Sequence, residues 1–574
     1  MKKNKNKKIV KKVRAEKCLK DLLFIVLSIF FFNNVHLSVH AQTIAPYLFG
    51  QNAWMPGTIG GTPYTAHNYG GSLSSHWQDV QDSHCTSVRI GGIAYDCNAP
   101  LFTYVTGPAT TAQLLTLIND VQTHGGEPIV QIAYGDAVTA NGALSSADAG
   151  NLVTAINVTN IGSIQRKVKY WIIGNEPDRY TNNKTAPLIA SYIKTYSAAM
   201  KSADPDIKII APELSYYEAM GGSAYKILTD PTDGLLKYGG ANDITGSSAY
   251  GYYVDYISFH YYPFDGTQTL SNVVNTITDN TNHGFDWQLS NLNSLLTTPN
   301  SYRSSNPLQI AVTEGNINYV NPGTNNLAGL GTDGFIAGQF WAEMLSKCMK
   351  NNVQFMNFWS VREGDDLGYL RNSDGSKRST WYHFELLANN FKGTYVDASF
   401  TNGYSDLKAF GSYSSTRSAV MVMNQSSGSY NYSINVGSGT SGSYSTKINF
   451  SSGINTSAYY NRTIAANSST LFVFDNNGNI SQETNYGLSD GTSAPANTCS
   501  TPFSCVNQTQ FNAYTPGVHS SVTIGGTSGT PTAISLDATH NTVFKSVGTI
   551  TITGAGGAFS SNNQALELIV TGCE

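Results

Sequence analysis

An apolar run ends abruptly in charge at residues 171–178, which read WIIGNEPD. Trp171 to Ile173 are residues typical of a strand that is covered on both faces. Pro177 ends a strand and fixes the turn that follows. Asn175 and Glu176 therefore stand at the tip of the predicted strand, and their purpose depends on the fold around that tip.

The stretch around WIIGNEPD is one of eight β-rich runs, most of them apolar along their whole length. Segments with helical periodicity separate them, such as residues 186–204 and 335–351. Eight strands that alternate with helices over about 330 residues predict an α/β fold, the (β/α)8 barrel. The eight runs are 47–54, 87–92, 128–135, 170–177, 207–214, 256–263, 308–316 and 353–361.

The pattern changes after the last helical stretch, which ends near residue 393. We therefore predict a catalytic barrel domain at 42–393. Strand-like runs with Ser, Gly and Asn turns predict a small antiparallel β-sandwich at 394–475. A polar linker is predicted at 476–500, and 501–574 is predicted to be a β-rich accessory or partial module.

The first 41 residues read as a secretory signal peptide. Nine Lys and Arg14 precede the apolar run LLFIVLSIFFF, and small residues lead up to Ala41. Cleavage after Ala41 predicts a secreted or cell-surface protein with no transmembrane segment. An uncleaved membrane anchor is the alternative.

Charge argues against a nucleic-acid partner. The leader holds ten of the 34 basic residues and two of the 38 acidic ones, which leaves 24 against 36 and a formal net charge of −12. A chain without a basic stripe offers little to a phosphate backbone. A neutral, polar substrate suits it better.

The sequence predicts no cofactor and no metal. It lacks a His-Glu-X-X-His motif, a phosphate loop and a dinucleotide fingerprint. The cysteines lack zinc-like spacing. Export permits disulfides, so Cys499 could pair with Cys505, and Cys85 with Cys97. Cys348 is predicted to be a buried thiol in a helix.

In a (β/α)8 barrel the active site lies at the carboxyl ends of the strands. Two glutamates, Glu176 and Glu314, close two strands that are three apart around the ring. Each alone is a weak signal, but together they predict two carboxyl groups in one bowl. The other strand-end candidates are Arg89, Asn175, His260, Tyr262 and Trp359.

Two facing carboxyl groups are what glycoside hydrolysis requires. One donates a proton to the leaving oxygen, and the other attacks the sugar or activates water. A separation of about 5–5.5 Å leads to retention of configuration, and about 6.5–9.5 Å leads to inversion. The sequence does not give this distance.

These motifs resemble the clan A glycoside hydrolases, which include endoglucanases, xylosidases and arabinofuranosidases. The resemblance covers residues 45–475. The matching pieces are Asn-Glu-Pro at 175–177, His-X-Tyr at 260–262, Thr-Glu-Gly at 313–315 and Trp359.

The resemblance implies a retaining mechanism, with Glu176 as acid/base and Glu314 as nucleophile. It also implies substrate-binding residues around them. Asn175 would bond the sugar 2-hydroxyl, and Trp359 would form the floor under the sugar. Arg89 and Tyr262 would hold the nucleophile ionised, and His260 would line the site near the acid/base.

The predicted function is a secreted retaining glycosidase that acts on polysaccharide or oligosaccharide, foremost an endo-β-glycanase. An exo-acting arabinofuranosidase or xylosidase is the alternative within that class. A transglycosylase would use the same residues. A different class, a non-catalytic carbohydrate-binding surface protein on an inactive barrel, also stays open. The oligomeric state is not predicted.

Overall fold

The computed structural model describes residues 42–499 apart from shorter stretches, and beyond 499 it describes the backbone of eight strands. The predicted leader at 1–41 lies outside the described residues. So do 55–57, 60–61, 64–72, 74, 93–110, 133–144, 160–166, 180–184, 222–224, 304, 321–325, 364–365, 438–440, 451–456 and 492.

Eight parallel strands close into a barrel, as predicted, and each of the eight β-rich runs supplies one of them. Every neighbouring pair is parallel, and the last strand pairs with the first. The strands, in order around the ring, are β2 (Phe49–Trp54), β5 (Ser87–Gly91), β6 (Glu127–Ile132), β7 (Tyr170–Ile173), β8 (Lys208–Leu214), β11 (Tyr256–Tyr261), β12 (Gln309–Gly315) and β13 (Val353–Phe358).

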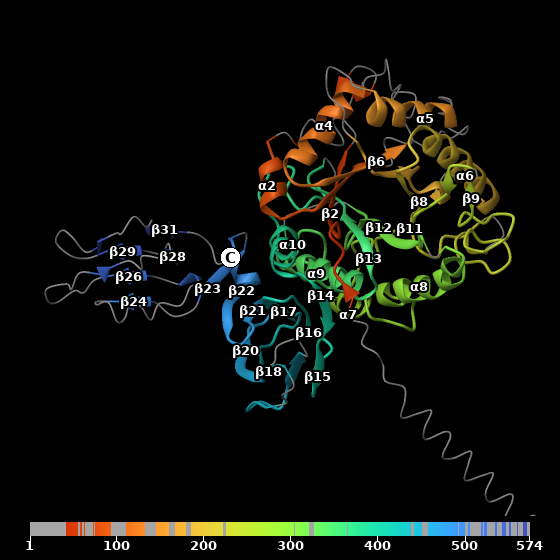
Figure 1. The fold of residues 1–574 in the computed structure, drawn as a ribbon. Helices are drawn as coiled ribbons and strands as arrows, with labels where there is room; N and C mark the ends of the chain where they lie inside the picture. The colour runs from red at the N-terminus through yellow and green to blue at the C-terminus, as the bar shows by residue number, and fades with distance from the viewer. Residues whose placement is uncertain are drawn as a thin grey trace, which may run out of the picture. The chain divides into compact units, whose positions relative to one another are not determined.

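Helices surround the barrel strands, as Figure 1 shows for α4, α5, α6 and α8. In α6 the apolar residues Ile189, Ile193 and Met200 recur at helical spacing and are buried. No helix within the described ranges is long and apolar enough to cross a membrane. The helices are α2 (Trp77–Asp82), α4 (Thr111–Thr123), α5 (Ser146–Val153), α6 (Ala186–Ala203), α7 (Leu270–Asn275), α8 (Phe285–Ser301), α9 (Phe335–Lys350) and α10 (Ser379–Asn390).

The barrel strands carry apolar side chains toward their amino ends and polar ones toward their carboxyl ends. A separate apolar cluster contains Ile129, Ile172, Ile210 and Phe355, one from each of four strands. Farther along the same or neighbouring strands lie buried polar residues, among them Gln131. Buried polar groups need partners, so this end of the barrel must hold a bonded network.

A β-sandwich follows the barrel. Its two sheets enclose a core that includes Val420, Tyr432, Ile448 and Phe472. One sheet has the order β1 (Gln42–Thr43), β14 (Thr394–Asp397), β16 (Leu407–Tyr413), β17 (Arg417–Asn424), β21 (Ser468–Asp475), β22 (Ile480–Gly487) and β23 (Ala496–Cys499). The other has the order β15 (Ser399–Thr401), β19 (Lys447–Phe450), β18 (Tyr430–Val436) and β20 (Ala458–Ile464).

The linker predicted at 476–500 is wrong over most of its length, because β22 and β23 extend the sandwich sheet there. In β22 every second residue from Gln482 to Tyr486 is buried. The first two of these buried residues, Gln482 and Thr484, are polar. A strand whose inward face is polar lacks the apolar alternation that predicts strands. At the other boundary, β1 pairs with β14 and so belongs to the sandwich sheet.

Residues 501–574, predicted to be β-rich, contain β24 (Phe503–Cys505), β25 (Val518–His519), β26 (Val522–Ile524), β27 (Ile534–Ser535), β28 (Thr542–Ser546), β29 (Ile550–Ile552), β30 (Phe559–Ser560) and β31 (Leu566–Val570). They form three small parallel sheets, β24-β26-β29, β25-β28-β31 and β27-β30. From β26 onward the chain visits the three sheets twice in the same order. That pairing is typical of a parallel β-solenoid.

Two of the predictions about cysteines concern residues that the structure describes. Cys348 is a buried free thiol, as predicted. Cys85 is also a buried free thiol, and Cys97, its suggested partner, lies outside the described residues. The Sγ of Cys85 lies 3.1 Å from the carbonyl oxygen of Ser87.

Candidate active site

Arg89, in β5, is the centre of the polar network at the carboxyl ends of the strands. Its side chain is completely buried, and the four hydrogens of its two terminal nitrogens are shared among five acceptors. Nη1 donates to Asn52 Oδ1 at 3.0 Å and Glu314 Oε1 at 2.6 Å. Nη2 donates to Gln131 Oε1 at 3.0 Å, Asn175 Oδ1 at 2.6 Å and Glu213 Oε2 at 3.1 Å. One guanidinium thus fixes acceptors from five different parts of the ring.

Glu314, in β12, has both carboxylate oxygens held. Arg89 donates to Oε1, and the hydroxyl of Tyr262 donates to Oε2 at 2.9 Å. Burial and the nearby charges of Glu314 and Glu176 raise the pKa of Tyr262 well above its ordinary value. Tyr262 therefore stays a neutral donor, and with Arg89 it supplies a hydrogen bond to each oxygen of Glu314.

Glu176 follows β7 in a strained backbone conformation. Gly174 and Glu176 both have positive φ, 78° and 43°, and Pro177 begins a short 3-10 helix, Pro177–Arg179. Such a conformation is costly for a residue other than Gly and persists only where the surrounding structure holds it. The amide of Glu176 donates to the carbonyl oxygen of Glu213 at 2.8 Å, which holds this turn in place.

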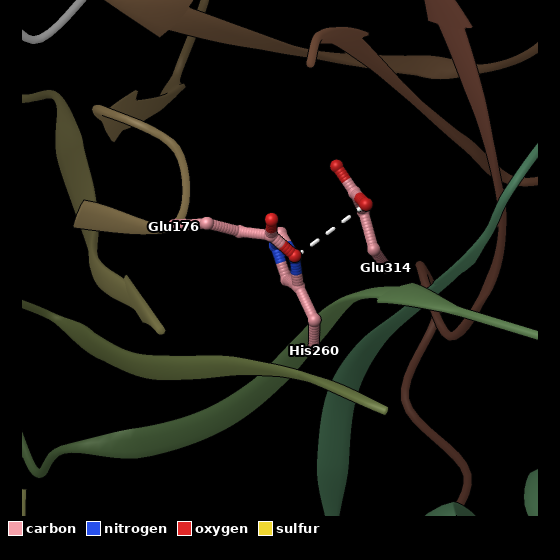
Figure 2. A group of neighbouring side chains, drawn as sticks. All are labelled: Glu176, His260 and Glu314. Atoms are coloured by element: carbon pink, nitrogen blue, oxygen red, sulfur yellow. Dashed lines mark hydrogen bonds and ion pairs between the residues drawn. The ribbon is translucent and has the colours of Figure 1, made fainter. Parts of the chain in front are cut away.

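The two glutamates face each other across one small space. Glu176, His260 and Glu314 point toward one another from different strand ends (Figure 2), and one ligand atom of each lies within 4.8 Å of the others. Both glutamates are 6% exposed. The two carboxylates predicted to share one bowl do so.

His260, in β11, lies among three carboxylates. Nδ1 lies 3.0 Å from Glu176 Oε1 and 3.5 Å from Glu314 Oε2, and Nε2 lies 3.3 Å from Glu213 Oε2. Burial lowers the pKa of His260, but the charge of Glu314 and the hydrogen bonds with Glu176 and Glu213 outweigh it and raise the pKa to about 10. The ring is thus a second buried cation beside Arg89.

The electrostatics of Glu176 follow from this neighbour. Burial raises the pKa of Glu176, but the hydrogen bond and charge of His260, together with the charges of Arg179 and Arg89, lower it overall. Arg179 Nη1 lies 3.6 Å from Glu176 Oε2. The proton of the 3.0 Å hydrogen bond between His260 Nδ1 and Glu176 is therefore held mainly by the ring nitrogen.

The remaining two predicted residues also lie at the strand ends. Asn175 is buried beside Arg89, as described above. Trp359 follows β13 and is 7% exposed. Its amide donates to the Gly315 carbonyl at 3.1 Å, and its carbonyl accepts from Asn316 Nδ2 at 2.7 Å. These bonds place its backbone directly beside the strand end that carries Glu314.

The network also contains a third glutamate, Glu213, and two amides, Asn52 and Gln131, which were not predicted. Glu213 lies in β8 and is completely buried, and its φ of 58° is left-handed like that of Glu176. The sequence pattern is the same as for the other two glutamates, because Glu213 lies near the end of the apolar run IKIIAPEL at 207–214. Asn52 and Gln131 lie inside strands, where a polar residue gives no such signal.

Within the described part of the chain, Glu176, His260 and Glu314 also form a group whose ligand atoms lie close enough to hold a metal ion. The surrounding charges argue against that use. Arg89 already bonds Glu314 at 2.6 Å, and a divalent cation would sit beside this buried guanidinium. His260 serves the two carboxylates as a donor, whereas a metal ligand must present a bare nitrogen.

No protein-family model matches the sequence, and no curated protein matches it. Solved structures do match. A family 51 alpha-L-arabinofuranosidase from Bifidobacterium longum is 14% identical with a TM-score of 0.50, covering 68% of this chain and 84% of its own. A second structure, described as an arabinofuranosidase, is 17% identical with a TM-score of 0.50, covering 76% of this chain and 96% of its own. The predicted resemblance is confirmed for the fold, a (β/α)8 barrel with a trailing β-sandwich.

Proposed function

We propose that the protein is a retaining glycoside hydrolase in which Glu314 is the nucleophile and Glu176 is the acid/base. One observation carries the proposal. Two buried carboxylates face each other with oxygens within 4.8 Å, and only one of them, Glu314, is held by both a guanidinium and a phenol hydroxyl. Different surroundings give two like groups different roles.

The short separation favours retention. Inverting enzymes need about 6.5–9.5 Å between the carboxyl groups to admit a water molecule, whereas retaining enzymes use about 5–5.5 Å. In the first step Glu314 attacks the anomeric carbon, and Glu176 gives its proton to the leaving oxygen. In the second step Glu176 takes a proton from water, which cleaves the glycosyl ester on Glu314.

The two steps fit the charges around each group. Arg89 and Tyr262 stabilise Glu314 as an anion before attack and as a leaving group afterwards. Glu176 must be protonated for the first step. A bound sugar displaces water and disfavours the carboxylate form, so the proton shared with His260 moves onto Glu176.

A binding-only protein on this barrel is a weaker proposal. Three carboxylates, one arginine and one histidine are buried together in the site. Burying charges costs several kcal/mol for each ion even when they are paired. A binding surface for a neutral sugar gains nothing from that arrangement, whereas catalysis by two carboxyl groups requires it.

We further propose a polysaccharide substrate, an endo-β-glycanase mode of action and export. The formal net charge of −12 without the leader suits a neutral glycan, and the predicted signal peptide supports export. The arabinofuranosidase names of the two matching structures make exo-acting removal of arabinose the main competing activity within the class.

Sugar release from a panel of polysaccharides and aryl glycosides tests the proposal. Glu314→Gln and Glu176→Gln are expected to lose nearly all activity on the substrate that wild type cleaves. Glu343→Gln is the matched control, because Glu343 is a buried glutamate in α9, paired with Lys408 in β16 outside the site. Mixed oligosaccharides indicate endo action, and a single monosaccharide indicates exo action. Glycan binding without cleavage, unchanged in both site variants, would overturn the proposal.

A further inference from the structure

Glu213 is the buried glutamate of the site network to which the two-carboxylate mechanism gives no role. Both its oxygens are occupied, because Oε1 accepts from the Thr313 hydroxyl at 2.7 Å and Oε2 accepts from Arg89 at 3.1 Å. His260 Nε2 lies 3.3 Å from Oε2. The backbone amide of Glu213 donates to the Ser258 hydroxyl at 3.1 Å. Its strained φ of 58° is maintained by this network.

The positions of the protons follow from the donors and acceptors. An ionised carboxylate can only accept, so each of the two contacts of the His260 ring needs one proton. In the contact between His260 and Glu213 the proton lies on Nε2 of the ring. Oε2 of Glu213 already accepts from the Arg89 guanidinium, and a proton on Oε2 would point at this donor. On the other side, Nδ1 and Glu176 Oε1 share the second proton at 3.0 Å.

We propose that Glu213 is a positioning residue that keeps His260 protonated at Nε2, so that Nδ1 serves as the proton reservoir of Glu176. The inference rests on the proposed function. Nδ1–H passes its proton to Glu176 Oε1, and Glu176 passes it to the leaving oxygen. When Glu176 later takes a proton from water, Nδ1 recovers its own, so the cycle leaves no net change.

All charged and titratable groups that face this pair contribute to its proton affinity. They are Glu176 after β7, Asp178 in the short 3-10 helix that follows it, Glu213 in β8, Glu314 in β12, Tyr262 after β11, Arg89 in β5 and the more exposed Arg179. Among them Glu213 is the carboxylate that contacts the ring and has no part in bond making. Its removal therefore changes the proton affinity of the pair without removing a reacting group.

The test is the pH dependence of kcat/KM for Glu213→Gln. An opposite charge at this range shifts a pKa by about 1–3 units. The alkaline limb is therefore expected to move to lower pH by about one unit or more, because His260 and Glu176 lose their shared proton more readily. Glu343→Gln is expected to keep both limbs. A Glu213→Gln enzyme that is slower at every pH, with the alkaline limb unmoved, overturns the proposal.

A second measurement needs neither a Glu213 variant nor a known substrate. The ring nitrogens of histidine-labelled wild-type protein are observed by ¹⁵N NMR, and His260 is assigned with His260→Gln. Protonated Nε2 at pH 7 supports the proposal, and bare Nε2 overturns it. If wild type cleaves no glycan but Nε2 is protonated, the proposed function fails while the bonding role of Glu213 stands.

Discussion

Removal of Arg89 is expected to destabilise the barrel strongly. Arg89→Met removes the donor to five acceptors and the cation of two buried ion pairs, with Glu314 at 2.6 Å and Glu213 at 3.1 Å. Removing one partner of a buried pair costs about 3–5 kcal/mol, because the other charge stays buried. Two carboxylates lose a cation here, but His260 and Tyr262 still bond them. The expected loss is therefore about 3–5 kcal/mol at pH 7, the cost of one unpaired charge.

The loss is expected to depend on pH. Burial raises the pKa of Glu213, but the charge of Arg89, the hydrogen bond and charge of His260 and the bond with Ser258 lower it overall. A carboxyl with a lowered pKa stabilises the fold above its unfolded value, about 4.3, and this contribution is lost as the pH falls through the folded value. Without Arg89 the pKa of Glu213 rises. As the pH falls, Glu213 therefore takes up its proton at a higher pH in the variant than in wild type. The difference between wild type and Arg89→Met should shrink between pH 7 and pH 4.5.

Urea unfolding followed by tryptophan fluorescence at both pH values provides the measurement. Arg89→Lys is the matched control, since lysine keeps the charge but has only three donors for five acceptors. It should fall between wild type and Arg89→Met. A loss below about 1 kcal/mol at pH 7, or an equal loss at both pH values, would refute the view that Arg89 neutralises ionised carboxylates.

Three other outcomes are expected. Tyr262→Phe removes a hydrogen bond to the Glu314 carboxylate, which is worth about 1.5–3 kcal/mol. Steady-state kinetics should therefore show a kcat/KM about 10- to 100-fold lower than that of wild type. An unchanged kcat/KM would contradict the role of Tyr262. His383, buried and bonded to Ser379 and Ser469, has a pKa lowered by burial to about 4, so the unfolded chain binds a proton first as the pH falls below about 6.5. Between pH 6.5 and 4, the free energy of unfolding measured in urea should therefore fall by about 3 kcal/mol less in His383→Gln than in wild type. An equal fall in the two proteins would contradict this. EDTA should leave glycan cleavage unchanged, since Arg89 supplies the cation beside Glu314, and loss of activity restored by a divalent metal would favour the metal reading.

The barrel was predictable from the sequence because its strands are buried on both faces and therefore read as continuous apolar runs. The same property located the site. A polar residue that ends such a run lies at the carboxyl end of the barrel, and this rule alone placed Arg89, Glu176, His260 and Glu314 in one bonded network.

Residues with weaker patterns were missed. Glu213 ends its strand as clearly as Glu176 does, but chemistry with two carboxyl groups gave no reason to seek a third. Its role depends on contacts with Arg89 and His260, which are far away in sequence and meet only in the folded barrel. The strand at 480–487 was missed because Gln482 and Thr484 occupy its buried face.

We propose above that Glu314 is the nucleophile of a retaining glycosidase. The most direct test is mass spectrometry after incubation with an activated 2-deoxy-2-fluoro glycoside of the sugar that wild type releases. The account predicts one added glycosyl group, and peptide mapping should place it on Glu314. A label on Glu176, or an active enzyme that takes no label and releases the inverted anomer, would contradict it.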